Sequence, residues 1–291
     1  MTAAASHTIA IDGVQLHAVE RGPRRGTPVL ILHGFTESSE AMAGVARALA
    51  PRRTICVDLV GHGRSDAPVD IGPYRMRHCV RQLVGVMDAL GVVRAHLLGY
   101  SLGGRVALRL CVARPQRVRS ALVVGASAGI ADPEPRRARL HDDDALADGI
   151  LRDGVPAFVD RWMALPLFAS QRRLGAGALA EARARRLRNR AVGLANSLRG
   201  MGAGAQEPLH ERLAALAVPL CLAVGEEDSK FRAIGADLAA RAPRARLALI
   251  EKAGHAAHLE NPDAFGELAE SFFREVEADV RSHATREGTP T

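Results

Sequence analysis

The sequence has few aromatic residues and no long apolar run. Aromatic residues make up 3% of its 291 residues and hydrophobic residues 47%, so a core must be built mainly from Leu, Val and Ala. No apolar run reaches the roughly 18 residues that suggest a membrane span. Met1–His7 also lacks the basic start and apolar segment of a secretion signal. These absences predict a globular protein of the cytoplasm without a membrane span.

Lysine is nearly absent as well, although the chain is basic. The formal net charge is +7, and Lys230 and Lys252 are the only lysines. The arginines are spread along the chain, and no zinc-finger, homeodomain or RNP motif accompanies them. We therefore attribute the positive net charge to a bias in composition and to a locally basic site, and we expect no nucleic-acid partner.

Metal and cofactor motifs are missing too. The chain has four cysteines, far apart and without C-x-x-C spacing: Cys56, Cys79, Cys111 and Cys221. Three lie in apolar runs, so we expect buried free thiols instead of disulfides or a metal site. His62, His78 and His96 do not stand at ligand spacing with cysteines or carboxylates. The chain has neither a Walker loop nor a G-x-G-x-x-G run, so we expect no metal and no cofactor.

What the chain does have is a regular alternation of short apolar runs and amphipathic stretches. This pattern is typical of a largely parallel sheet covered by helices, so the fold class is α/β. Strands are expected at Thr8–Ile11, Val14–Val19, Val29–Leu32, Thr54–Leu59, Ala95–Leu98, Ala121–Val124, Leu220–Val224 and Leu247–Ile250. Helices are expected at Ser39–Leu49, Met76–Leu90, Leu102–Ala113, Ile234–Arg241 and Pro262–Val280, with a frayed tail after them.

One long segment breaks the alternation. Residues 129–216 are rich in Arg, Ala and Leu and contain no convincing strand. Inserted after the sixth strand, they would form a helical cap over the strand ends, where open α/β sheets bind ligands. The sequence thus predicts a core of residues 1–128 and 217–291, and a cap of residues 129–216 that supplies the substrate pocket.

The strongest motif follows the fifth expected strand. The run from Gly99 to Gly103, G-Y-S-L-G, lies directly between an apolar strand and a helix. In this context a sharp turn lifts the serine hydroxyl above the edge of the sheet. Small residues fit both ends because the turn crowds its neighbours. We predict that Ser101 is the catalytic serine.

A serine hydroxyl needs a base, because at its own pKa it is a poor nucleophile. His255 follows Gly254 on a loop after the last expected strand, in the place that the chain order Ser, Asp, His requires. His258 is the competing choice, three residues later, where it fits packing at the start of the next helix. We predict that His255 is the base.

An acid and an oxyanion hole would complete such a site. The acid should end the preceding strand, and we choose Asp228 over the neighbouring Glu226 and Glu227. Oxyanion stabilisation needs backbone N–H donors beside the serine. The N–H groups of Phe35, which follows an expected strand, and of Leu102, which follows the serine, are the natural pair.

The expected cap is rich in arginine, whereas the cap of a lipase or simple esterase would be mainly apolar. Its arginines include Arg136, Arg137, Arg139, Arg152, Arg161, Arg183, Arg185, Arg186, Arg188, Arg190 and Arg199. Most must belong to solvated helix faces. A subset that points into the pocket would bind carboxylates bidentately, so a polyanionic substrate is favoured.

Four runs together resemble one known family. They are Gly99 to Arg105, Trp162 with Pro166 to Ser170, Gly225 to Arg232, and Gly254 to Pro262. The family is the 2-succinyl-6-hydroxy-2,4-cyclohexadiene-1-carboxylate synthases of menaquinone biosynthesis, in the α/β-hydrolase superfamily. The resemblance implies the α/β-hydrolase fold, with a mostly parallel eight-stranded sheet flanked by helices and a helical cap. The Asp-Ser-Lys-Phe and Pro-Leu-Phe-Ala-Ser runs are its most particular parts.

The resemblance also implies a lyase. Such an enzyme eliminates pyruvate from 2-succinyl-5-enolpyruvyl-6-hydroxy-3-cyclohexene-1-carboxylate, after the triad serine abstracts the ring proton beside the succinyl carbonyl. Residues that match the family's substrate-binding positions are Tyr100, Arg105, Arg139, Trp162 and Arg188. Arg136 or Arg137 could replace Arg139, because the register there is loose. The alternative is an α/β-hydrolase that cleaves a carboxylester or C–C bond of an anionic substrate.

Overall fold

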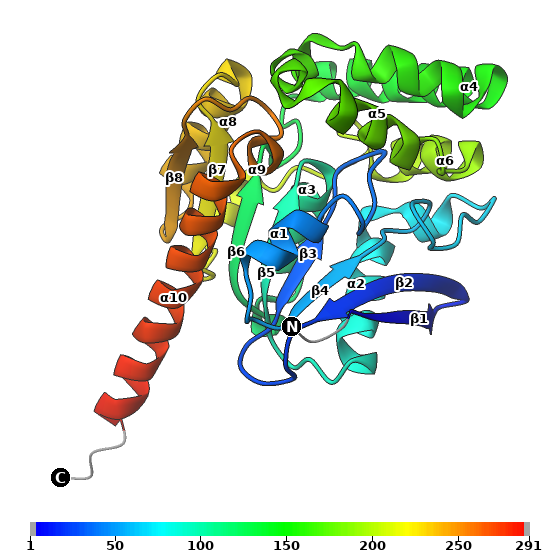
Figure 1. Ribbon diagram of the computed structural model, residues 1–291. Helices are drawn as coiled ribbons and strands as arrows, with labels where there is room; N and C mark the ends of the chain where they lie inside the picture. The colour runs from blue at the N-terminus through cyan, green and yellow to red at the C-terminus, as the bar shows by residue number, and fades with distance from the viewer. Residues whose placement is uncertain (1–3, 288–291) are drawn as a thin grey trace.

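One eight-stranded sheet organises the structure, a computed structural model that describes residues 4–287 (Figure 1). The strands are β1 (Ala5–Ile11), β2 (Val14–Arg21), β3 (Val29–Leu32), β4 (Thr54–Val57), β5 (Ala95–Tyr100), β6 (Val118–Val124), β7 (Leu220–Gly225) and β8 (Ala245–Ile250). Their order is β1-β2-β4-β3-β5-β6-β7-β8. β2 is antiparallel to β1 and β4, and every pair from β4 to β8 is parallel. The carboxyl ends of the parallel strands therefore meet at one edge, where loops can converge on a site.

Helices cover both faces of the sheet. They are α1 (Ala43–Ala48), α2 (Met76–Ala89), α3 (Leu102–Ala113), α8 (Ser229–Arg241), α9 (Ala257–Glu260) and α10 (Pro262–Glu287), with short 3-10 turns η1 (Gly72–Tyr74) and η2 (Pro115–Arg117). In β3, Leu30 and Leu32 pack towards α2 and α3, whereas Val29 and Ile31 pack towards α1 and α10. Each fully buried side chain of this size contributes about 1.5–3 kcal/mol relative to exposure. The central strands are thus a rigid base for the loops at their ends.

A helical segment joins β6 to β7 and lies over the carboxyl edge of the sheet (Figure 1). Its elements are α4 (Pro133–Met163), η3 (Pro166–Leu174), α5 (Gly175–Arg186), α6 (Ala191–Met201) and α7 (His210–Leu213). α4 bends at Gly154, whose φ is 81°, and its Phe158 packs with Leu194 of α6 in a separate apolar cluster. Within residues 4–287 no strand interrupts this segment. We call this segment the cap. Its bounds as a separate unit, residues 129–216, remain a prediction from the sequence.

The C-terminal helix is longer than the sequence analysis predicted. α10 continues to Glu287, whereas the expected end was Val280 with a frayed tail after it. No Gly or Pro stands between these two residues, so nothing in the sequence stops the helix there. Residues 288–291 of the expected tail lie outside the described residues.

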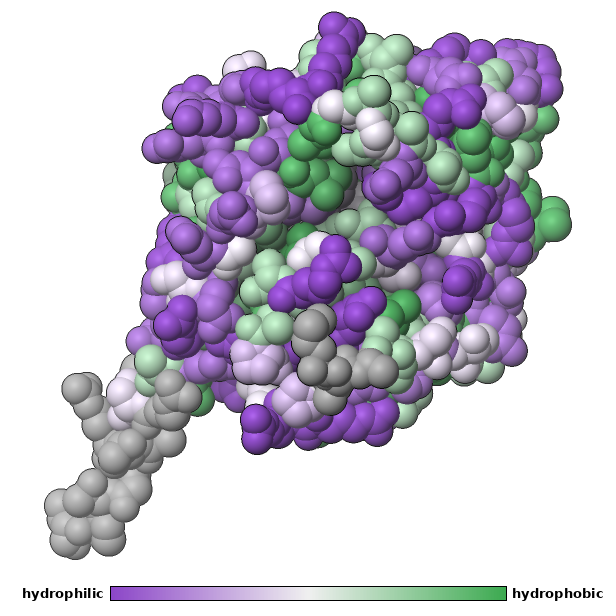
Figure 2. Space-filling model, in the orientation of Figure 1, coloured by the Kyte–Doolittle hydropathy of each residue, from purple (hydrophilic) through white to green (hydrophobic). Residues whose placement is uncertain are grey.

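The outer surface shows no helix suited to a bilayer. Among residues 4–287, no helix is both long enough and apolar enough to cross a membrane. The face of the molecule in Figure 2 is mostly hydrophilic, and hydrophobic residues reach it in separate patches. The four cysteines are free and buried.

Candidate active site

Ser101 stands on a strained turn between β5 and α3. Its φ is 50°, in the left-handed region that non-glycine residues rarely adopt. The glycines on both sides are sterically required: a Cβ on Gly99 would lie 2.4 Å from the Gly103 carbonyl oxygen, and one on Gly103 would lie 2.3 Å from that of Leu32. Close packing of strand and helix therefore forces the serine outward from the sheet edge.

The predicted triad residues are brought together by three different loops. His255 Nε2 lies 3.3 Å from Ser101 Oγ, and His255 Nδ1 lies 2.9 Å from Asp228 Oδ2. Both His255 and Asp228 are buried. The other oxygen of Asp228 accepts a hydrogen bond from Phe231 N at 3.2 Å, because Asp228 caps the N-terminus of α8. This geometry allows His255 to take a proton from the serine while Asp228 fixes its tautomer.

The competing residues lie elsewhere. His258 packs against Tyr100 with ring centroids 4.5 Å apart, and burial, with a smaller effect of His255, lowers its pKa to about 3. Glu227 is paired with Arg173 at the surface, 2.8 Å apart. Glu226 accepts a hydrogen bond from Lys252 N at 3.3 Å. Among the described residues, none of these three side chains has a hydrogen bond to the triad.

The backbone donors predicted for an oxyanion hole flank the serine. Leu102 is the first residue of α3, so its N–H has no partner within the helix. The N–H of Phe35 donates none of the loop hydrogen bonds found in residues 4–287. Phe35 and Leu102 line the same cavity as Ser101, and the Phe35 ring packs edge-on against Trp162 of the cap, 5.3 Å between centroids.

A cavity of about 240 Å³ lies between the serine and the cap. Of the predicted substrate-binding residues, it is lined by Tyr100, Arg105, Arg139 and Trp162. Arg105 is held by hydrogen bonds to the carbonyl oxygen of Met201 at 2.7 Å and to Gln206 Oε1 at 2.9 Å. Burial, followed by the nearby charge of Arg139, lowers its pKa to about 10. Arg105 is therefore still protonated at neutral pH and presents a partly desolvated charge.

The structure places the three arginines around residue 139, between which the sequence left the choice open, in different surroundings. Arg139 lines the cavity and is paired with Asp143, Nε to Oδ1, at 2.8 Å. Arg136 lines a separate cleft, and Arg137 is exposed. Of these three arginines, Arg139 is therefore the one that lines the cavity with the serine.

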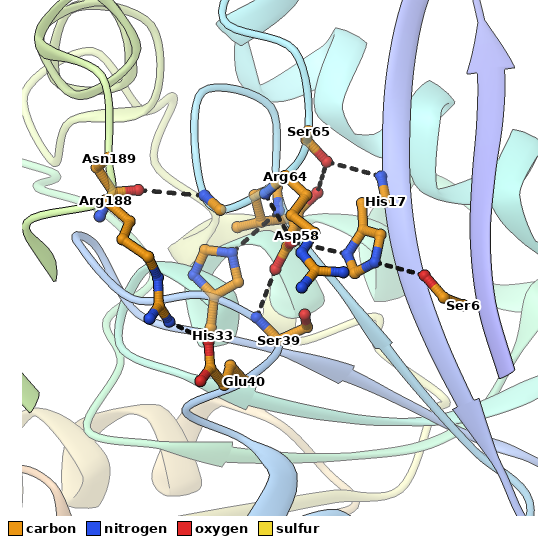
Figure 3. Close-up of polar contacts among 12 residues, drawn as sticks. Ser6, His17, His33, Ser39, Glu40, Asp58, Arg64, Ser65, Arg188 and Asn189 are labelled. Carbon is orange, nitrogen blue, oxygen red and sulfur yellow. Dashed lines mark hydrogen bonds and ion pairs between the residues drawn. The ribbon is translucent and has the colours of Figure 1, made fainter. Parts of the chain in front are cut away.

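Arg188 does not line the cavity. It forms an exposed ion pair with Glu40 outside the cavity (Figure 3). Arg186 occupies the cavity wall instead. The two residues are separated by the end of α5, and side chains two positions apart on a helical turn point in nearly opposite directions. The assignment of Arg188 to the pocket is therefore corrected to Arg186.

Arg186 and two other charged residues of the cavity wall were missed as candidates. The Arg186 side chain is only 5% exposed and forms an ion pair with Glu37, which also lines the cavity. Lys230 is the third, two residues after Asp228. Its signal was present, because it is one of two lysines and lies in the Asp-Ser-Lys-Phe run. The cavity wall thus carries four cationic side chains, which are Arg105, Arg139, Arg186 and Lys230.

Comparisons with known proteins extend over most of the chain. Residues 27–262 match the family described as alpha/beta hydrolase fold. A Bacillus subtilis (strain 168) protein, provisionally named 2-succinyl-6-hydroxy-2,4-cyclohexadiene-1-carboxylate synthase, is 38% identical over 91% of this chain and 97% of its own. The synthase of that name from Klebsiella pneumoniae subsp. pneumoniae is 35% identical over 85% of this chain and 94% of its own. The structure of MenH from S. aureus has a TM-score of 0.85 at 28% identity and covers 89% of this chain and 98% of that chain.

Proposed function

The chain belongs to the α/β-hydrolase fold family and, within it, to the 2-succinyl-6-hydroxy-2,4-cyclohexadiene-1-carboxylate synthases, and we propose on this premise how its residues perform the reaction. The predicted fold class and family resemblance are confirmed. The enzyme is a lyase of menaquinone biosynthesis that eliminates pyruvate from 2-succinyl-5-enolpyruvyl-6-hydroxy-3-cyclohexene-1-carboxylate.

The elimination starts with proton abstraction. Ser101 Oγ removes the ring proton next to the succinyl carbonyl and passes its own proton to His255 Nε2. The electron pair moves onto the carbonyl oxygen, which the N–H groups of Phe35 and Leu102 stabilise. The electron pair then returns from this oxygen to the ring, the ring double bond shifts, and the C–O bond to the enolpyruvyl group breaks. The leaving group departs as the enolate of pyruvate and becomes pyruvate when it takes up the proton held on His255. The ring becomes the 2,4-cyclohexadiene, and the triad is restored.

One observation carries the assignment of residues. A hydrogen-bonded Ser101–His255–Asp228 set opens onto a cavity whose wall holds three arginines and a lysine. The substrate has three carboxylates, one on the ring, one on the succinyl chain and one on the enolpyruvyl group. Arginine binds carboxylates through paired hydrogen bonds, so cationic groups in the same cavity as the base suit this substrate better than a neutral ester.

A direct test follows pyruvate and the conjugated diene together. Purified protein is incubated with the enolpyruvyl substrate, with the Ser101→Ala variant as the control. Both products should appear at equal rates and be lost in the variant. Rapid hydrolysis of neutral acyl esters without pyruvate release would instead favour the hydrolase alternative.

Two further predictions concern where and with what the enzyme acts. We propose a cytoplasmic location, supported by the four free, buried cysteines, because a reducing compartment keeps thiols unpaired. We also propose that the partner is a small polyanion and not a nucleic acid, because the cavity wall concentrates cationic groups around the serine.

A further inference from the structure

We infer that Asn189, a cap residue that does not line the cavity, is a positioning residue for the oxyanion hole. It fixes the loop of residues 33–40, which we call the oxyanion loop, in the shape that directs the Phe35 N–H towards the substrate. This inference rests on the proposed role of the Phe35 N–H.

The oxyanion loop contains a backbone conformation that needs outside support. Thr36, directly after Phe35, has φ 69°. This left-handed region is unfavourable for a β-branched residue, because its Cβ crowds the backbone. Such a residue keeps the conformation only where its surroundings enforce it.

Hydrogen bonds from the core hold the two ends of the oxyanion loop, and a turn in which Glu37 N donates to the Gly34 carbonyl oxygen at 3.1 Å closes its middle. At one end His33 Nε2 accepts a hydrogen bond from Leu59 N at 3.0 Å, and at the other Ser39 N donates to Asp58 Oδ1 at 2.5 Å (Figure 3). Asp58 is itself anchored, because it also accepts from Arg64 N at 3.0 Å. The middle of the loop, around Thr36, is held from the other side.

Asn189 supplies that support through its whole side-chain amide. Its Nδ2 donates to the Thr36 carbonyl oxygen at 2.7 Å and to that of Arg186 at 3.0 Å. Its Oδ1 accepts from Gly63 N at 3.1 Å (Figure 3). Only one orientation of the amide satisfies two carbonyl acceptors and one N–H donor. Asn189 is buried, so water cannot replace these bonds.

A second cap side chain contacts Thr36 and the residue that follows it. Arg186 donates to Thr36 Oγ1 at 3.2 Å and forms a buried ion pair with Glu37. The cap therefore contacts both the backbone and the side chain of Thr36. Because Arg186 also lines the substrate cavity, Asn189 is the residue that tests loop positioning without removing a charge from the cavity.

Loss of the Asn189 amide should affect the transition state more than substrate capture. Thr36 would relax towards an ordinary φ, and the Phe35 N–H before it would turn away from the developing oxyanion. Asn189 bonds to the backbone of Arg186, whereas the Arg186 side chain is held by Glu37, so the cationic groups that capture the substrate should stay in place. Removal of a whole oxyanion donor lowers kcat by about 10²–10³, and a displaced donor should lower it by about 10–100-fold with KM nearly unchanged.

Asn196 provides a matched control. It is also a buried cap asparagine, and its Nδ2 also donates to core carbonyl oxygens, those of Pro68 at 3.1 Å and Val69 at 2.9 Å. Those residues do not belong to the oxyanion loop. Asn196→Ala should therefore remove a similar anchor between cap and core while changing kcat less than about threefold.

The experiment compares Asn189→Ala with Asn196→Ala in two assays. One measures kcat and KM for pyruvate release. The other measures 4-nitrophenolate released when diethyl 4-nitrophenyl phosphate modifies Ser101, a step that also develops charge on an oxygen. Slowing of both in Asn189→Ala alone supports the inference. Equal effects of the two variants, or a raised KM with normal kcat, would overturn it.

Two outcomes separate this inference from the proposed function. If nitrophenolate release is slow in Asn189→Ala and the wild type releases no pyruvate, the lyase assignment is wrong and the positioning role of Asn189 stands. If Asn189→Ala releases pyruvate at the normal rate, the lyase assignment stands and the positioning role of Asn189 is wrong. If the alanine variant does not fold, Asn189→Ser and Asn196→Ser give the same comparison, because serine keeps a small polar group in the site.

Discussion

The imidazole of His255 and the carboxylate of Asp228 are joined by a 2.9 Å hydrogen bond, Nδ1 to Oδ2, and both side chains are buried. This bond leaves Nε2 unprotonated and directed at Ser101. A buried histidine can be protonated during the reaction only where a carboxylate stabilises the cation.

Asp228→Asn should therefore lower kcat by about 10³–10⁴. The amide would hold the wrong tautomer of His255, with its proton on the nitrogen that faces Ser101. Pyruvate release measures the effect, and circular dichroism checks folding. Glu227→Gln is the matched control, because Glu227 lies on the same loop but pairs with Arg173 at the surface; an equal loss there would contradict the assignment.

Arg186→Lys should raise KM about tenfold. Lysine keeps the positive charge but loses the paired hydrogen bonds to a carboxylate. Arg188→Lys should change KM less than about twofold, because Arg188 is paired with Glu40 outside the cavity. Initial rates of pyruvate release over a range of substrate concentrations separate the two. The reverse order would restore the assignment made from sequence.

Two buried histidines should make the protein less stable in mild acid. Burial lowers the pKa of His62 and of His258 to about 3 in the folded protein, from 6.5. Because the unfolded chain binds these protons first, the free energy of unfolding falls as pH drops below about 6.5 and levels off near pH 3. Each histidine should lower the free energy of unfolding by about 2 kcal/mol at pH 5 relative to pH 7.5.

Urea unfolding at the two pH values measures this loss. His62→Asn should shrink the difference between pH 7.5 and pH 5 by about 2 kcal/mol. His141→Asn should leave it unchanged, because the His141 side chain is 87% exposed. An equal change in both variants would show that burial is not the cause.

Gly103→Ala should prevent folding or destabilise the protein by more than about 3 kcal/mol. The added Cβ would lie 2.3 Å from the backbone oxygen of Leu32, which cannot move away. Gly177→Ala is the control, since no atom lies within 4 Å of its Cβ position in α5. That change should stabilise by about 0.5–1 kcal/mol. Thermal melting compares the two.

The sequence predicted the bounds of helices and strands best where a sequence motif adjoins a buried apolar run. β3 and α3 have the bounds predicted for them, because a short apolar run and the G-Y-S-L-G turn mark their ends. β1 begins earlier than predicted, at Ala5, because backbone pairing with β2 includes polar residues such as Ser6 and His7. Such pairing depends on the neighbouring strand and leaves no hydrophobic signal.

The cap was harder to predict in detail. Its helical character follows from composition, but the direction of each arginine depends on where a helix ends. α5 ends at Arg186, and this position decides that Arg186 and not Arg188 enters the cavity. The support that Asn189 gives to Thr36 joins residues 153 positions apart, so no local pattern reveals it.

Because they are buried, the four cysteine thiols of the folded protein should react slowly with thiol oxidants and alkylating reagents. Burial raises the pKa of Cys56, Cys79 and Cys111 to about 12 and that of Cys221 to about 11. Since only the thiolate reacts, modification at neutral pH must wait until the chain opens. The rate at which a thiol reagent labels the native enzyme therefore measures how often the chain opens spontaneously. The natural cysteines suffice for this measurement, without an engineered label.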